Sequence, residues 1–208
     1  MNQEINYKDL KKYIKHKDIY MILGHDINNQ FSNLVELNKV INKINKLIKK
    51  NSILLYFGDI SDIDNPNIGL VFDELYVKRD DIEIIMIQID KDKEIDIELS
   101  DFVSKVMWHN KYPRTKKTIY NGIINNKPVS NTLIWYELAQ IEKFKNIFVL
   151  GGNNLTIDEI NLANTLEIPY IYYPLKRKYL GDGKTLVSKK LSFEDKIGPT
   201  HLFYEIKI

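Results

Sequence analysis

The hydrophobic pattern divides the chain into short apolar runs and longer segments in which apolar residues recur every third or fourth position. The apolar runs stop at glycine, proline or a charged residue, which is typical of buried strands. The last residues alternate apolar and polar side chains, a pattern that predicts an edge strand. We therefore predict strands over residues 18–23, 52–57, 82–89, 147–150 and 170–173, with a final strand within 201–208.

The segments between these runs have the period of amphipathic helices. The clearest is 34–48, where leucine, valine and isoleucine repeat over a background of lysine and asparagine. Asn65 and Pro66 have the form of an N-cap followed by proline at the first helical position. Further helices are predicted from there to about residue 78, from 131 to about 144, and after Thr156.

Strands that alternate with helices of this length build a parallel sheet covered by helices on both faces. We predict an α/β fold: a Rossmann-like three-layer domain with a mainly parallel sheet of about five strands. The pattern shows no repeat and no linker, so residues 1–208 are interpreted as a single domain. Between residues 90 and 129 the pattern is weaker and predicts a short helix at 99–107 and an added hairpin around Asn125 and Asn126.

Composition narrows the classes of function. The net charge of +2 is small for a protein that grips a polyphosphate backbone, so no nucleic acid partner is expected. The absence of cysteine excludes disulfides and thiolate chemistry. The polar first residues lack the apolar core of a signal peptide, and no apolar run approaches the length of a membrane span. We therefore expect a soluble, intracellular, cytoplasmic protein without a membrane partner.

Candidate chemistry lies where three of the predicted strands end. In a parallel sheet these ends share one edge, where glycine lets backbone amides approach a ligand and Asn or Asp can hold ribose hydroxyls or a base edge. Turn geometry alone also favours these residue types, and neither GxGxxG nor GxxxxGK[ST] occurs. The candidate ligand-binding residues are Gly24, His25, Asp26, Gly58, Asp59, Gly151, Gly152, Asn153, Asn154 and Thr156.

Two of the polar residues allow more than one interpretation. Thr156 and Glu159 have the spacing of a capping box, which is the favoured explanation, and Glu159 is alternatively a general acid or base. His25 is a strand-end residue, a ribose contact or a general base. No metal site is expected, because the histidines are scattered and the aspartates at 59, 62 and 64 lack the glycine and distal glutamate of a calcium loop. No cofactor is predicted.

The segment NIFVLGGNNLTIDEINLANTLEIPYIYY resembles the core of the SLOG superfamily, Rossmann-like domains named after the LOG family. The LOG pattern is a strand, then Pro-Gly-Gly-x-Gly-Thr-x-x-Glu, then a helix, and Gly151, Gly152, Thr156 and Glu159 match it. Leu150 replaces the proline, the turn is one residue longer, and the Arg-Lys signature of the hydrolases is missing from the preceding helix.

The resemblance implies a nucleotide or nucleotide-derived ligand, such as a nucleoside phosphate, an ADP-ribose-like molecule or a cyclic nucleotide, with its phosphate over residues 151–154. Because the hydrolase signature is missing, we expect a sensor or sequestering protein. The alternative is an N-glycosidase, a nucleoside 5'-monophosphate phosphoribohydrolase that uses Glu159 as its acid or base. SLOG-like domains often pair, so the resemblance is also compatible with a homo-oligomer.

Overall fold

The computed structural model describes the secondary-structure elements and part of their connections. The described residues are 3–23, 34–56, 68–89, 103–109, 123–124, 127–128, 131–151, 154–173 and 203–205.

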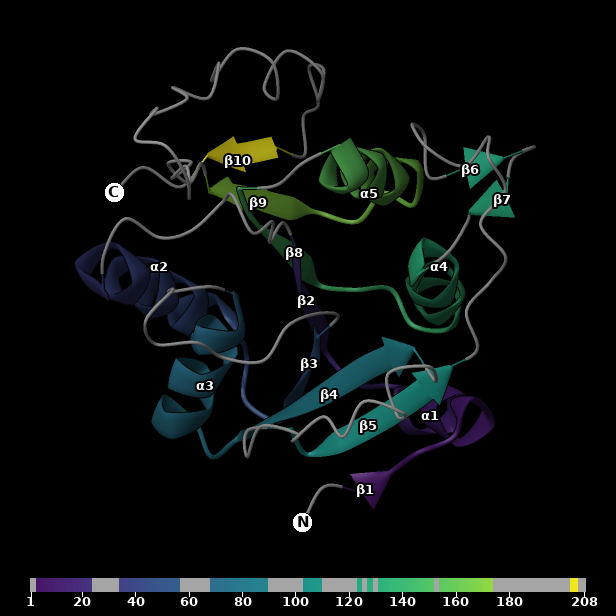
Figure 1. Cartoon of the computed structure of the whole chain (residues 1–208), viewed down its shortest axis with the longest axis horizontal. Helices are drawn as coiled ribbons and strands as arrows, with labels where there is room; N and C mark the ends of the chain where they lie inside the picture. The colour runs from purple at the N-terminus through teal and green to yellow at the C-terminus, as the bar shows by residue number, and fades with distance from the viewer. Residues whose placement is uncertain are drawn as a thin grey trace, which may run out of the picture.

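The centre of the molecule is an eight-stranded sheet in which all neighbouring strands are parallel (Figure 1). Its order is β1-β5-β4-β3-β2-β8-β9-β10. The five strands predicted from apolar runs form its continuous middle, from β4 to β9, and confirm the α/β Rossmann-like fold. The strands are β1 (Gln3–Glu4), β2 (Ile19–Leu23), β3 (Ser52–Tyr56), β4 (Ile82–Ile89), β5 (Lys105–His109), β8 (Asn146–Leu150), β9 (Tyr170–Tyr173) and β10 (Phe203–Glu205).

Helices cover both faces of the sheet, which makes the three layers (Figure 1). Side chains of successive strand residues point to opposite faces, so Met21 joins one hydrophobic core and Ile22 the other. The first core contains residues of α1 (Tyr7–Tyr13), α4 (Asn131–Ile141) and α5 (Asn154–Thr165). The second contains residues of α2 (Leu34–Leu47) and α3 (Ile68–Lys78). Within the described ranges, no helix is long and apolar enough to cross a membrane.

The predictions for the middle of the chain were right in one part and wrong in the other. The hairpin is confirmed, because β6 (Ile123–Ile124) and β7 (Lys127–Pro128) pair in antiparallel fashion around residues 125 and 126. The helix predicted over 99–107 is wrong at its end, where Lys105–His109 forms β5 beside β4. Met107 is fully buried there, and burial against a neighbouring strand overrides the weak local preference of a short segment.

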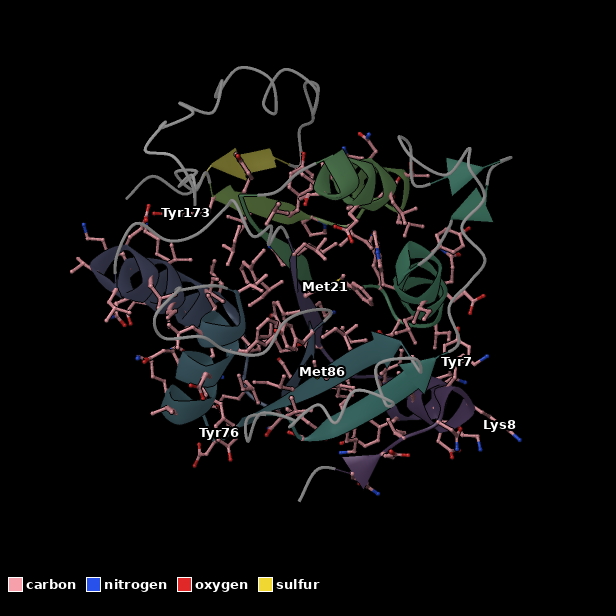
Figure 2. The ribbon with its side chains drawn as sticks, viewed as in Figure 1. Tyr7, Lys8, Met21, Tyr76, Met86 and Tyr173 are labelled. Atoms are coloured by element: carbon pink, nitrogen blue, oxygen red, sulfur yellow. The ribbon has the colours of Figure 1, made fainter. Side chains whose placement is uncertain are left out.

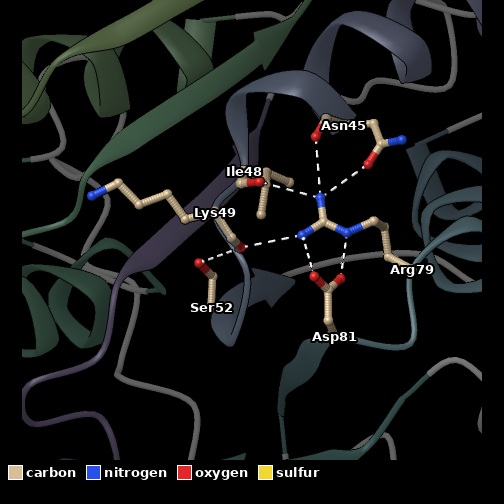
Figure 3. Close-up of polar contacts among 6 residues, drawn as sticks. All are labelled: Asn45, Ile48, Lys49, Ser52, Arg79 and Asp81. Carbon is tan, nitrogen blue, oxygen red and sulfur yellow. Dashed lines mark hydrogen bonds and ion pairs between the residues drawn. The ribbon is translucent and has the colours of Figure 1, made fainter.

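The strands begin at one edge of the sheet, here called the amino edge, and end at the opposite carboxyl edge. At the amino edge, Arg79 closes the end of α2 (Figure 3). Its Nη1 donates to the carbonyl oxygens of Asn45 and Ile48 at 3.1 and 3.2 Å, and its Nη2 donates to the carbonyl of Lys49 at 3.3 Å. The Nε and Nη2 atoms of the same guanidinium donate hydrogen bonds to the two carboxylate oxygens of Asp81. A guanidinium is well suited to this place, because the last carbonyls of a helix have no partner within the helix.

A second polar contact at the amino edge is centred on Asp18, which precedes β2. The ammonium groups of Lys49 and Lys145 each lie 3.2 Å from one of its carboxylate oxygens. Burial raises the pKa of Asp18, but hydrogen bonds and charge from the two lysines outweigh burial and hold this pKa below its usual value. The carboxylate thus links the end of α2 to the segment that enters β8.

Asp18→Asn is expected to lower the free energy of unfolding at pH 7 by up to about 1 kcal/mol, because both lysines are largely exposed and screened by water. A carboxyl group whose pKa is lower in the folded state stabilises the fold at pH values above its pKa in the unfolded chain, about 3.9. This contribution disappears as the pH falls through the pKa of the folded state. The difference between wild type and variant should therefore shrink from pH 7 to pH 2.5 in urea titrations. Asp80→Asn, the same change at an exposed position, is the control; an Asp18 effect that does not depend on pH would contradict the ion pairs.

Candidate functional site

The carboxyl edge contains a topological switch point between β2 and β8. These strands are direct neighbours, with Leu23 paired to Val149. The helix that follows β2 is α2, which packs on one face of the sheet, and the helix that follows β8 is α5, which packs on the other. In open α/β sheets, ligands bind beyond the carboxyl ends of strands where the connections diverge in this way.

The strand ends selected from the sequence belong to three adjacent strands, in the order β3-β2-β8. Because these strands are parallel, the segments that leave them start from the same edge, as predicted. Gly151 and Thr156 are described, and Asn154 is described as the first residue of α5. Gly24, His25, Asp26, Gly58, Asp59, Gly152 and Asn153 lie outside the described residues, so their roles stay predictions.

Gly151 has the conformation that its motif requires. Its φ is 61°, which lies in the left-handed region. A residue with a Cβ atom adopts this conformation only at a cost in free energy, whereas glycine does not. Its backbone N–H donates to the carbonyl oxygen of Tyr173 at 2.8 Å and so continues the pairing of β8 with β9 past the last strand residue. The glycine turns the chain sharply toward α5 while the strand end stays tied to its neighbour.

The capping box predicted for Thr156 and Glu159 is wrong. An N-cap residue lies just outside the helix, but α5 begins at Asn154, so Thr156 is in its first turn and is 3% exposed. Glu159 is half-buried in the second turn. At about 1.5 Å per residue, its Cα lies about 7.5 Å along the axis from the first residue of the helix.

Sequence reasoning missed a polar pair at the carboxyl edge. Tyr173, at the end of β9, is 2% exposed, and its side chain belongs to the core on the α2 face (Figure 2). Its hydroxyl is hydrogen-bonded to Glu36, in the first turn of α2. Burial raises the pKa of Tyr173 strongly, and the charge and hydrogen bond of Glu36 raise it further, so the hydroxyl is the donor and the carboxylate the acceptor. No local motif signals this pair, because its members come from distant segments.

Among the described residues, the charge at the switch point comes from backbone groups and from acids. The first turns of α2, α3 and α5 lie at the carboxyl edge, where a helix carries roughly half a positive charge on its free N–H groups. In the described parts of these first turns and of the ends of β2, β3, β8 and β9 there is no lysine or arginine. Over the same described chain, no three His, Asp or Glu side chains gather as a metal site. Among the described groups, the free backbone N–H groups of these first turns are the ones that attract an anion.

Comparisons with known proteins support the fold. No family model matches the chain, and no curated protein matches it. Among solved structures, one of the molybdenum cofactor carrier protein from Chlamydomonas reinhardtii matches with a TM-score of 0.50 at 15% identity, over 92% of this chain and 91% of that chain. A second structure of the same carrier protein gives a TM-score of 0.44 at 16% identity, over 92% and 90%. The first likeness extends over nearly the whole of both chains, which agrees with the Rossmann-like fold described above.

Proposed function

We propose that this protein binds a nucleotide or nucleotide-derived molecule at the switch point between β2 and β8 and holds it without turnover, as a sensor, carrier or sequestering protein. The observation that carries this proposal is the turn from β8 into α5. There, a left-handed glycine and the amino end of a helix lie at the point where ligands of open α/β sheets bind.

The phosphate of the ligand is assigned to this turn. Unpaired N–H groups of a first helical turn, together with the helix dipole, attract phosphate without a basic side chain. This suits an edge whose described residues include no lysine or arginine near the switch point. Gly152, Asn153 and Asn154 complete the turn in the sequence, and we assign them to the phosphate on that basis.

Binding without turnover is favoured over hydrolysis for two reasons. The Arg-Lys signature of the LOG hydrolases is missing from the helix that precedes the glycine turn. The structure that shares this fold at a TM-score of 0.50 is of a protein named as a cofactor carrier. We therefore treat base release as an outcome to be tested and not as the expected activity.

The direct test is a thermal-shift panel of nucleoside monophosphates, cyclic nucleotides, NAD, ADP-ribose and molybdenum cofactor. The same wells are then analysed by mass spectrometry for free base. We expect a higher melting temperature with at least one compound and no released base. Gly152→Val should abolish this shift, because the side chain blocks close approach of phosphate to the backbone. Lys143→Ala, at an exposed position near the amino edge, should keep it.

Other outcomes separate the alternatives. Release of base that stops in Glu159→Gln would replace the binding proposal by the hydrolase. A shift that survives Gly152→Val would remove the ligand from the glycine turn. If no compound changes the melting temperature, nucleotide binding is rejected.

A further inference from the structure

The Glu36 and Tyr173 pair joins the first turn of α2 to the end of β9, the strand beside β8. Tyr173 is the last residue of β9, where it is paired with Leu150 of the neighbouring strand β8. Its carbonyl oxygen accepts a hydrogen bond from the N–H of Gly151. Glu36 belongs to the helix that leaves β2. Tyr173 is therefore hydrogen-bonded directly to the glycine turn, and Glu36 lies in the first turn of the helix that follows β2.

The surroundings of this pair suit the uncharged part of a nucleotide better than its phosphate. Leu34 and Val35, which precede Glu36, are 48% and 64% exposed. A carboxylate repels phosphate, whereas it accepts hydrogen bonds from the N–H and O–H groups of a nucleoside. An exposed apolar surface beside a fixed acceptor is the kind of lining that small-molecule sites use to orient a ring.

We infer that Glu36, held in place by Tyr173, is a ligand-binding residue that accepts hydrogen bonds from neighbouring N–H or O–H donors of the nucleoside part of the ligand. The inference rests on the proposed function and adds to it the orientation of the ligand, with phosphate at α5 and nucleoside at the start of α2. A carboxylate can accept several hydrogen bonds at once, so the bond from Tyr173 leaves this role chemically open. Tyr173 is a positioning residue, since its single hydroxyl proton is directed at Glu36.

A purely structural role for the pair makes different predictions. A carboxylate in the first turn of a helix interacts favourably with the dipole, and its bond to Tyr173 fastens α2 to β9. If that were its whole function, Glu36→Gln and Tyr173→Phe would change the melting temperature and leave the affinity for every ligand within twofold. The decisive quantity is therefore the affinity for each ligand, measured on variants that circular dichroism shows to be folded.

The experiment is isothermal titration calorimetry of wild type, Glu36→Gln and Tyr173→Phe with GMP, guanosine, AMP and adenosine. Loss of a hydrogen bond to a charged group is worth about tenfold or more in affinity. Glu36→Gln should weaken each nucleotide and its nucleoside by the same factor of about ten, because the lost contact involves the part they share. Tyr173→Phe should give a smaller loss in the same direction. If Glu36→Gln strengthens the nucleotides and leaves the nucleosides unchanged, Glu36 faces the phosphate and the inference is overturned.

Two further ligands identify the donors. IMP lacks the 2-amino group of guanine, and 2'-deoxy-GMP lacks one ribose hydroxyl. The ligand that lacks the contacted donor should bind wild type more weakly, and Glu36→Gln should no longer affect it. Binding by wild type that Glu36→Gln leaves within twofold for all four parent ligands overturns this inference and keeps the proposed function. Absence of any binding by wild type overturns both.

Discussion

Arg79→Ala is expected to lower the free energy of unfolding by about 3 kcal/mol, since it removes a charged donor from the carbonyls that end α2. The guanidinium side chain is only 14% exposed, so water cannot fully replace its hydrogen bonds. The hydrogen bond from Arg79, together with its charge, also holds the pKa of Asp81 below its usual value despite burial. Urea unfolding followed by circular dichroism measures the first effect, and the carboxyl resonance of Asp81 the second.

Two variants make this result specific. Arg79→Lys keeps the charge but loses the planar fork, so most of the destabilisation should remain. Lys78→Ala removes a neighbouring cation that forms an ion pair with Glu74 one turn away, and should cost less than about 0.5 kcal/mol. A loss below about 1 kcal/mol for Arg79→Ala would show that the end of α2 does not depend on this side chain.

Gly151→Val is expected to have the second largest effect, on stability and on ligand binding together. A β-branched residue at a φ of 61° costs about 2 kcal/mol, because its Cβ atom crowds the backbone in the left-handed region. The variant should melt several degrees lower. At 10 °C, where the folded state still dominates, the variant should also fail to bind the ligand identified in the thermal-shift panel. The measurements are differential scanning calorimetry and titration calorimetry on the same preparation.

The converse change is available elsewhere in the chain. Glu167, in the turn between α5 and β9, has a φ of 52° without being glycine. Glu167→Gly should therefore leave stability equal or raise it by up to about 1 kcal/mol, and it should not affect binding at the carboxyl edge. If Gly151→Val were tolerated as well as Glu167→Gly, the left-handed conformation at residue 151 would not be a requirement of the fold.

The central strands could be predicted from the sequence because each is buried on both faces. A strand covered on both sides is apolar over most of its length, and β4 was predicted over the residues that form it. The short outer strands carry weaker signals. β5 was assigned to a helix, and β1 consists of two exposed polar residues. Where few side chains are buried, the partner strand and not the local sequence decides the conformation.

The candidate site could be predicted only in part, for a similar reason. Gly151 was found because a glycine after a buried strand is a local signal, and the structure gives it the expected positive φ. Thr156 was taken as the start of α5, although the chain enters the helix two residues earlier, at Asn154. Glu36 and Tyr173 were missed because their contact depends on how α2 crosses the sheet. Such contacts between distant segments are set by packing and leave no pattern along the chain.

The position of β2 in the sheet has a consequence for synthesis on the ribosome. One side of β2 pairs with β3, which follows it closely in the chain, but the other side pairs with β8, and Tyr20 meets Asn146. Pairing between distant segments is slow, and unpaired strand edges attract other chains. A nascent chain that has completed β3 therefore carries a wholly apolar strand with one open side until most of the protein has been made. That interval is when this protein would most need a chaperone.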